Sequence, residues 1–257
     1  MLWQIILIGI LEGITEWLPI SSTGHMLLLD AWLPLQLEEG FKEMFFVVIQ
    51  LGAILAVAVE YGGTLFRPCG DTLRLWTKVL AGCVPAGVLG LLLDDFLEAR
   101  FGTPVTIAAM LILYGIAFLL MEEKAPPPRT SDIAAMSYPS AVGIGLFQAL
   151  AMIPGTSRSG ATILGGLLLG VSRTAAAEFS FFLALPTMLG ASGLKLMKFG
   201  LDFTLEELCA LFVGMVTAFA VSMLTIRFLV GFVRRHNFKP FGWYRIVLGT
   251  LILTLSA

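Results

Sequence analysis

The stretch that decides the fold reads Glu12-Gly13-Ile14-Thr15-Glu16-Trp17-Leu18-Pro19-Ile20-Ser21-Ser22-Thr23-Gly24-His25. Its two carboxylates lie one helical turn apart in a run of residues that is otherwise almost wholly apolar. Charged side chains inside an apolar span are costly and are usually retained for function. Because Glu12 and Glu16 share one face of a helix, their like charges repel each other. We therefore expect a cation or a proton to lie between them.

The composition of the whole chain is that of an integral membrane protein. Of its 257 residues, 58% are hydrophobic and 13% are charged, and the mean hydropathy is +0.91. Soluble domains carry about 25% charged residues. The net charge of −2 and the lack of a basic run argue against a nucleic-acid partner. Cys69, Cys83 and Cys209 are too far apart in sequence for a zinc site or a disulfide framework.

Six segments are long and apolar enough to cross a bilayer, which takes about 20 residues. They are residues 42–60, 74–93, 103–121, 175–197, 206–229 and 241–257. Two further apolar regions, 1–33 and 138–171, are each broken by a run of Pro, Gly, Ser and Thr residues. Polar backbone at membrane depth must line a cavity or be buried in protein. We therefore predict an all-α integral membrane protein with six transmembrane helices and two re-entrant helical hairpins.

The two breaks resemble each other. The first reads Leu18-Pro19-Ile20-Ser21-Ser22-Thr23-Gly24, and the second reads Ile153-Pro154-Gly155-Thr156-Ser157-Arg158-Ser159-Gly160. The single membrane domain, 1–257, then divides into halves of about 1–122 and 138–257, joined by the Pro-rich linker 123–137. Each half is one hairpin followed by three spans. Corresponding interrupted helices are typical of a two-fold repeat with a site where the halves meet.

The distribution of positive charge favours an inverted repeat. If the first hairpin enters from outside and the second from inside, eleven loop cations lie inside and four lie outside. The inner set is Arg67, Arg74, Lys78, Lys124, Arg129, Arg173, Arg227, Arg234, Arg235, Lys239 and Arg245, and the outer set is Lys42, Arg100, Lys195 and Lys198. This bias follows the positive-inside rule and places both termini outside. No basic stretch precedes the first apolar segment, so we expect it to be a retained helix and not a cleaved signal peptide.

The polar residues of the two breaks suit a ligand that carries phosphate. The planar guanidinium of Arg158 is always charged and matches phosphate oxygens. Short Gly/Ser/Thr loops that open a helix offer backbone N–H groups to an anion. Glu12 and Glu16 cannot bind phosphate directly, but they can hold a divalent cation such as Mg²⁺ or Ca²⁺ that does. A phosphate that reaches a site inside the membrane is most naturally carried on a lipid.

Each of these residues also has a purely structural explanation. Ser21, Ser22 and Thr23 could simply cap the helix that follows them. His25 could be a helix-start residue with satisfied hydrogen bonds, and Arg158 could be paired with a carboxylate for stability alone. The two glutamates could form a proton relay. The functional hypothesis therefore depends on the conjunction of these residues and not on any one of them.

Three stretches resemble the undecaprenyl-diphosphate phosphatases of the bacitracin-resistance type, in order and at family spacing across the chain. They are Glu12 to His25 as quoted above, Pro154-Gly155-Thr156-Ser157-Arg158-Ser159-Gly160-Ala161-Thr162, and Ala177-Glu178-Phe179-Ser180-Phe181-Phe182-Leu183-Ala184-Leu185-Pro186. The resemblance implies a multi-pass enzyme of the bacterial inner membrane that converts undecaprenyl diphosphate to undecaprenyl phosphate, the lipid carrier of cell-wall synthesis. It also implies a divalent cation and an active site facing the outer, periplasmic side, and it allows a homodimer.

The resemblance also assigns roles by motif position. Glu16, Ser22, His25 and Arg158 would be catalytic, and Glu12 with Glu16 would hold the metal, unless Glu16 is the base and Glu12 holds the metal alone. The substrate-binding residues would be Ser21, Thr23, Gly24, Gly155, Thr156, Ser157, Ser159 and Gly160. Our first choice of nucleophile is Ser22 activated by His25. Direct attack by His25 and attack by a metal-bound water are the alternatives.

A second class of function fits the architecture equally well. Inverted repeats with broken helices near the midplane are typical of secondary transporters. A carrier or flippase for a phosphate-bearing lipid or an anion would use Glu12 and Glu16 as a coupling-ion site and Arg158 as the substrate anchor. A carrier does not require His25 and the neighbouring hydroxyl groups, and their presence favours the enzyme.

Overall fold

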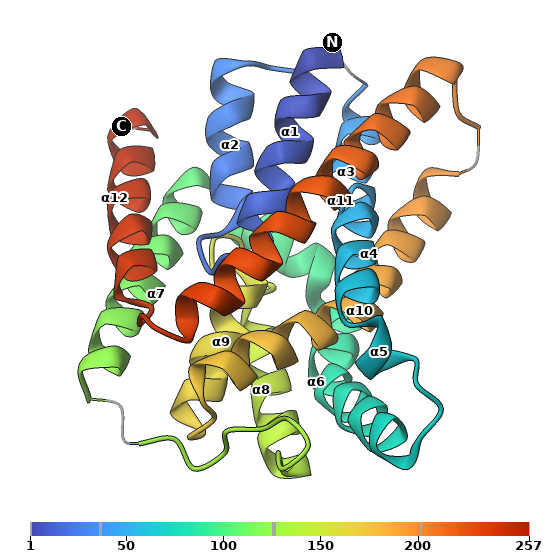
Figure 1. Ribbon diagram of the computed structural model, residues 1–257. Helices are drawn as coiled ribbons and strands as arrows, with labels where there is room; N and C mark the ends of the chain where they lie inside the picture. Colours follow the sequence, from blue (N-terminus) through green and yellow to red (C-terminus); the bar gives the residue numbers. More distant parts are fainter. Residues whose placement is uncertain (1, 36–37, 125–126, 201, 257) are drawn as a thin grey trace.

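The computed structural model describes residues 2–35, 38–124, 127–200 and 202–256 (Figure 1). Its helices are α1 (Leu2–Thr15), α2 (Ser22–Trp32), α3 (Glu39–Val48), α4 (Gln50–Glu60), α5 (Gly62–Leu65), α6 (Gly70–Phe101), α7 (Pro104–Lys124), α8 (Tyr138–Leu150), α9 (Arg158–Leu168), α10 (Arg173–Phe199), α11 (Leu205–Val233) and α12 (Lys239–Ser256). Ala125 and Pro126 of the predicted linker, and Met1 and Ala257 at the ends of predicted segments, lie outside the described residues. Within the described residues the chain is helical, with one isolated bridge between Thr130 and Val171.

Five segments of the described chain are long and apolar enough to cross a membrane. They are Glu39–Glu60 (α3 with α4), Gly70–Leu93 in α6, and the helices α7, α10 and α11. These segments coincide with the first five predicted spans, so the prediction of a helical membrane protein is confirmed. The sixth predicted span, 241–257, corresponds to α12, which has 18 residues but is not among the five. Outward-facing side chains such as Leu91, Phe212 and Leu224 are exposed, as a lipid-facing surface requires.

Both predicted breaks interrupt the helix at a serine. Ser21, between α1 and α2, has φ 72°, and Ser157, between α8 and α9, has φ 71°; no other described residue except glycine has positive φ. A helix cannot continue through this left-handed conformation. Each serine then caps the next helix, because Ser21 Oγ accepts from the N–H of Gly24 at 3.4 Å and Ser157 Oγ accepts from that of Gly160 at 3.1 Å. The two breaks therefore share one local geometry.

The two broken helix pairs lie on opposite sides of the molecule, with α1 and α2 at the top of Figure 1 and α8 and α9 at the bottom. Their turns approach each other in the middle. Helix α1 packs along α11, helix α8 packs along α6, and α7 packs along α12. Glycines permit these close approaches: a Cβ on Gly145 would lie 1.9 Å from the carbonyl oxygen of Gly82, and one on Gly9 would lie 2.9 Å from that of Gly214. Small residues of this kind are the usual means of close helix packing in membranes.

Three cations that the sequence assigned to loops are buried within helices. Arg245 lies in α12 and is 0% exposed. Lys78 in α6 donates to the carbonyl oxygen of Ala134 at 2.7 Å, and Lys42 in α3 forms an ion pair with Asp30 at 2.6 Å. They are therefore not loop residues, and their assignment to the inner or outer side stays a prediction. Charge that is removed from water must be paired or hydrogen-bonded, and each of these side chains has found such partners.

Candidate active site between the two breaks

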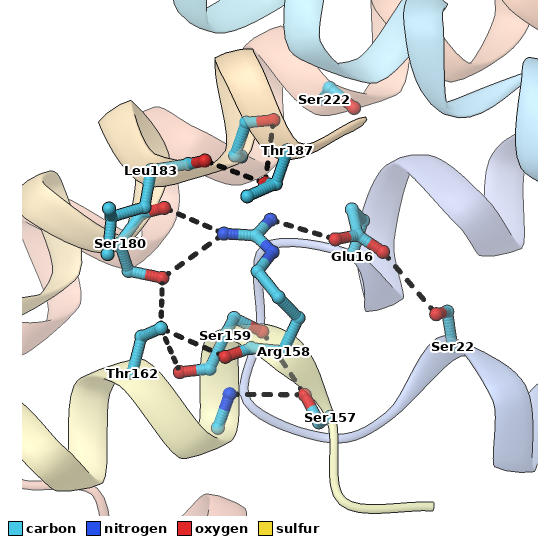
Figure 2. Close-up of polar contacts among 12 residues, drawn as sticks. Glu16, Ser22, Ser157, Arg158, Ser159, Thr162, Ser180, Leu183, Thr187 and Ser222 are labelled. Carbon is cyan, nitrogen blue, oxygen red and sulfur yellow. Dashed lines mark hydrogen bonds and ion pairs between the residues drawn. The ribbon is translucent and has the colours of Figure 1, made fainter. Parts of the chain in front are cut away.

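A buried ion pair joins the two breaks. Arg158, the first residue of α9, places Nη2 2.8 Å from Oε1 of Glu16, which directly follows α1. The two side chains are only 14% and 6% exposed. Figure 2 shows the guanidinium held between Glu16 on one side and α10 on the other. The structure therefore brings two of the predicted catalytic residues into direct contact, although they are 142 positions apart in the chain.

Helix α10 fixes the other side of the Arg158 guanidinium. Nη1 donates to the carbonyl oxygen of Ser180 at 2.7 Å and to its hydroxyl at 3.3 Å, and that hydroxyl accepts from Thr162 Oγ1 at 2.7 Å. The guanidinium also lies 5.5 Å from the ring centroid of Trp17. Its Nε is buried and has no partner among the described residues. Sequence reasoning did not assign a role to Ser180, although it lies in the third stretch that carried the family resemblance.

The hydroxyl groups of both breaks extend this contact. Ser22 Oγ donates to Oε2 of Glu16 at 3.4 Å. Ser159 Oγ donates to the carbonyl oxygen of Leu18 at 3.2 Å, which is a second link between the breaks, and it shares a 3.2 Å hydrogen bond with Ser157 Oγ. Ser22 therefore contacts the ion pair directly, and Ser157 and Ser159 form a second group of contacts between the breaks.

The other predicted substrate-binding residues make no side-chain hydrogen bond to the ion pair in the described part of the chain. Ser21 caps α2 through the N–H of Gly24, and Thr23 is exposed and makes no hydrogen bond within the described chain. Gly155 has φ 91° and touches the backbone of α7. Thr156 is fully buried, and its hydroxyl has no partner among the described residues.

Glu12 offers a free acceptor beside the ion pair. It lies one turn before Glu16 in α1 and is 2% exposed, and its Oε1 has no hydrogen-bond partner among the described residues. Within that part of the chain no group of three or more His, Cys, Asp and Glu side chains could hold a metal ion. Mg²⁺ is often held by only one or two carboxylates, with substrate phosphates completing its coordination. The two glutamates therefore fit a cation that binds together with a phosphate.

His25 has hydrogen-bond partners other than Ser22. Its Nδ1 lies 2.7 Å from the carbonyl oxygen of Ser21, and its Nε2 lies 2.7 Å from the hydroxyl of Tyr244, whose ring stacks on the imidazole at 5.6 Å. Because a carbonyl only accepts, Nδ1 carries the proton of the neutral ring, and Nε2 accepts from the tyrosine. The pairing of Ser22 with His25 that the sequence favoured is not among the hydrogen bonds of the described residues. Glu16 is the group that accepts from Ser22.

Helix α12 supplies two site residues that sequence reasoning missed. Tyr244 binds His25, and its neighbour Arg245 donates to the carbonyl oxygens of Pro19 at 3.1 Å, Gly155 at 2.9 Å and Thr156 at 2.8 Å. One buried guanidinium thus binds the main chain of both breaks. The sequence did hold a signal, since an arginine inside an apolar helix is expensive and is normally retained for function.

Residues 5–251 match the family described as bacitracin resistance protein BacA. The chain belongs to this family. It is 57% identical to an undecaprenyl-diphosphatase of Enterococcus faecalis, over 99% of this chain and 96% of that protein. Proteins of the same name are 54% identical in Desulfitobacterium hafniense and 53% identical in Lachnoclostridium phytofermentans, each over 98% of this chain and 95% of the relative. Both breaks and the Tyr244–Arg245 pair fall within the BacA match.

We predict that Arg245→Gln destabilises this BacA-family protein, because Arg245 links the main chains of the two breaks. The substitution removes donors from five carbonyl groups, three of them in the breaks, so we expect the free energy of unfolding to fall by about 2–4 kcal/mol. Thermal unfolding of the purified protein in detergent measures this change. The control is Arg227→Gln, which removes an exposed pair with Glu60 and should have a much smaller effect. Equal effects of the two substitutions would contradict the role of Arg245 as a link.

Proposed function

We propose that this protein hydrolyses undecaprenyl diphosphate to undecaprenyl phosphate and inorganic phosphate. The product is the lipid carrier of cell-wall synthesis, and its recycling confers resistance to bacitracin. The observation that carries the proposal is the buried contact of Arg158 with Glu16, which gathers an arginine, a carboxylate and a serine hydroxyl inside a helical membrane protein. The full-length similarity to undecaprenyl-diphosphatases supports the choice of substrate.

Binding of the diphosphate would use the groups that the second break presents. Arg158 is held by α10, and its buried Nε has no partner in the described part of the chain. Phosphoryl transfer depends mostly on positioning and on neutralising negative charge, and a fixed guanidinium provides both. The first turn of α9 adds backbone N–H groups and the positive end of a helix dipole. The isoprenoid tail would remain among the apolar outer faces of the helices.

The attack on the terminal phosphorus would begin at Ser22. Its hydroxyl donates to Glu16, so Glu16 would take the proton as the Ser22 oxygen bonds to the terminal phosphorus. The bond from that phosphorus to the bridging oxygen would break, and undecaprenyl phosphate would leave. Water would then hydrolyse the phosphoserine and release inorganic phosphate, with Glu16 returning the proton to Ser22. This arrangement favours Glu16 over His25 as the base. Attack by His25 itself would first require Nε2 to leave the Tyr244 hydroxyl. A water molecule bound to the cation is the third route.

Glu12 would hold the divalent cation, Mg²⁺ or Ca²⁺, that the family resemblance implies, and Glu16 would be a second ligand in the routes that do not use it as the base. Such an ion, when bound, neutralises charge on the diphosphate oxygens. The free Oε1 of Glu12 supports this assignment. Two carboxylates on one helical face also need a positive partner, and Arg158 contacts only one of them.

The architecture would be an inverted two-fold repeat of one re-entrant hairpin and three spans, with α12 as the sixth span. The packing supports this proposal because equivalent helices of the two halves pack on equivalent partners in the opposite half. The first helix of each hairpin packs along the second span of the other half, α1 on α11 and α8 on α6, and the third spans, α7 and α12, pack on each other. The loop charges then favour an active site that opens to the outer side of the bacterial inner membrane. Both breaks come from one chain, so the chemistry does not require the homodimer that the resemblance allows.

We predict that the wild-type protein in detergent releases inorganic phosphate from undecaprenyl diphosphate, and that Arg158→Ala and His25→Ala reduce the rate at least about a hundredfold. Each substitution removes a charge or a proton acceptor from the site. Phosphate released per mole of folded protein is the readout. A carrier or flippase of the same architecture would release none, because transport leaves the phosphoanhydride bond intact. That result would favour the transport hypothesis.

We predict that a chelator of divalent cations abolishes phosphate release and that added Mg²⁺ or Ca²⁺ restores it. The reason is that Glu12 and Glu16 repel each other, and the diphosphate, without a cation between them. The rate in excess chelator, before and after the ion is returned, is the measurement. Full activity in excess chelator would assign the two glutamates to proton transfer.

We predict that Ser22→Ala reduces the turnover number far more than Ser21→Ala does. Ser22 donates to the base, whereas Ser21 caps α2, and loss of a cap costs only about 1 kcal/mol of stability. Steady-state kinetics of the two variants, together with their unfolding temperatures, separate the two roles. Equal and mild losses would indicate that Ser22 is not the nucleophile.

A further inference from the structure

Gln148 is a buried polar side chain without a partner. It lies in the last turn of α8 and is 3% exposed, and neither its amide oxygen nor its amide nitrogen makes a hydrogen bond within the described residues. An amide that is removed from water without compensation is costly. An apolar side chain of the same size would avoid that cost. The chain therefore keeps Gln148 for something other than packing.

Gln148 occupies in α8 the place that Glu12 occupies in α1. Positions 21 and 157, the two capping serines with positive φ, differ by 136, and so do positions 12 and 148. Gly9 and Gly145, which touch the backbone of a neighbouring helix, differ by the same number. Oε1 of Glu12 also lacks a partner among the described residues. The last turn before each break thus carries one unpartnered polar side chain.

The packing of α8 places the helix against α6, which in turn packs on α10, the helix that holds the site arginine. Gly145 lies one turn before Gln148 on the buried face of α8. A Cβ added at Gly145 would lie 1.9 Å from the carbonyl oxygen of Gly82 in α6. A Cβ on Gly82 would in turn lie 2.9 Å from Leu183 in α10. Leu183 is about one turn beyond Ser180, whose carbonyl oxygen accepts from the site arginine. Gln148 lies one turn closer to the break than this junction, at the position of α8 that matches Glu12 in α1.

We propose that Gln148 is a further binding residue for the diphosphate group, with its amide N–H₂ donating to a phosphoryl oxygen. The proposal rests on the proposed function. Phosphoryl oxygens only accept hydrogen bonds, and an amide nitrogen offers two donors without adding charge. The equivalent turns of the two hairpins would then contact different parts of the ligand. The carboxylate of Glu12 would contact the cation, and the amide of Gln148 would contact the anion.

The test is Gln148→Met, which keeps the size of the side chain and removes both polar atoms. We expect kcat/KM for phosphate release to fall about tenfold or more, the loss typical of a hydrogen bond to a charged group. The unfolding temperature in detergent should stay at the wild-type value or rise, because the variant no longer buries an unpaired amide. Wild-type kinetics in Gln148→Met would overturn the proposal. A loss of activity that merely follows a lower unfolding temperature would also overturn it.

Gln148→Glu distinguishes an anion contact from a cation contact at nearly constant shape. A carboxylate would repel the diphosphate, so we expect this variant to be less active than Gln148→Met. Higher activity than Gln148→Met would mean that the side chain binds a cation, and it would overturn the phosphate contact. Gln4→Met, on the partly exposed face of α1, is the matched control and should retain wild-type kinetics and stability.

Wild-type phosphate release, measured first, separates this proposal from the one on which it rests. Absence of release would overturn the proposed function. Binding of inorganic pyrophosphate to the wild type and to Gln148→Met, measured by calorimetry in the presence of Mg²⁺, then tests the anion contact by itself. About tenfold weaker binding in the variant supports the contact, and equal binding overturns it.

Discussion

One ion pair, between Glu16 and Arg158, connects two segments that the chain brings together from opposite sides. Removing two charges from water is expensive, and a buried pair is rarely a net source of stability. Its presence at the centre of a membrane protein therefore indicates a function for the charges. The surrounding groups agree with this interpretation, because Ser180 orients the guanidinium and Ser22 contacts the carboxylate.

The charges around this pair are incompletely matched by the protein. Among the described residues, one buried carboxylate oxygen of Glu12 has no partner, and the hydrogen bonds of Arg245 go to main-chain carbonyl oxygens. A ligand that combines a divalent cation with a diphosphate would supply a positive partner for the glutamate and a negative charge near the arginine. The left-handed conformations of Ser21 and Ser157 add strain of the kind that persists at functional sites. Under the proposed function, this buried oxygen of Glu12 is where the divalent cation would bind.

The sequence predicted those features that follow from hydropathy and from chain-breaking residues. Five spans and both breaks agree with the structure, because apolar length and a Pro/Gly/Ser run act locally. The contact of Glu16 with Arg158 is tertiary, and the sequence predicted it only through the likeness of the two breaks, which suggests that they meet where the halves join. The missed features depend on tertiary contacts. Arg245 lies near the first residue of the predicted span 241–257, and the sequence alone suggests a loop charge. Its role depends on the position of α12 beside both breaks. The hydrogen bonds of His25 depend on Tyr244, 219 positions away, and no local pattern reveals that contact.

The most direct test of this account is a double-mutant cycle with Glu16→Gln, Arg158→Gln and the variant that combines them. Unfolding free energies in detergent are the quantity to compare. Each single substitution leaves one buried charge without its partner, so we expect the combined variant to lose at least about 1 kcal/mol less than the sum of the single losses. Strictly additive losses would mean that the two breaks are not joined by this ion pair, and the account would fail.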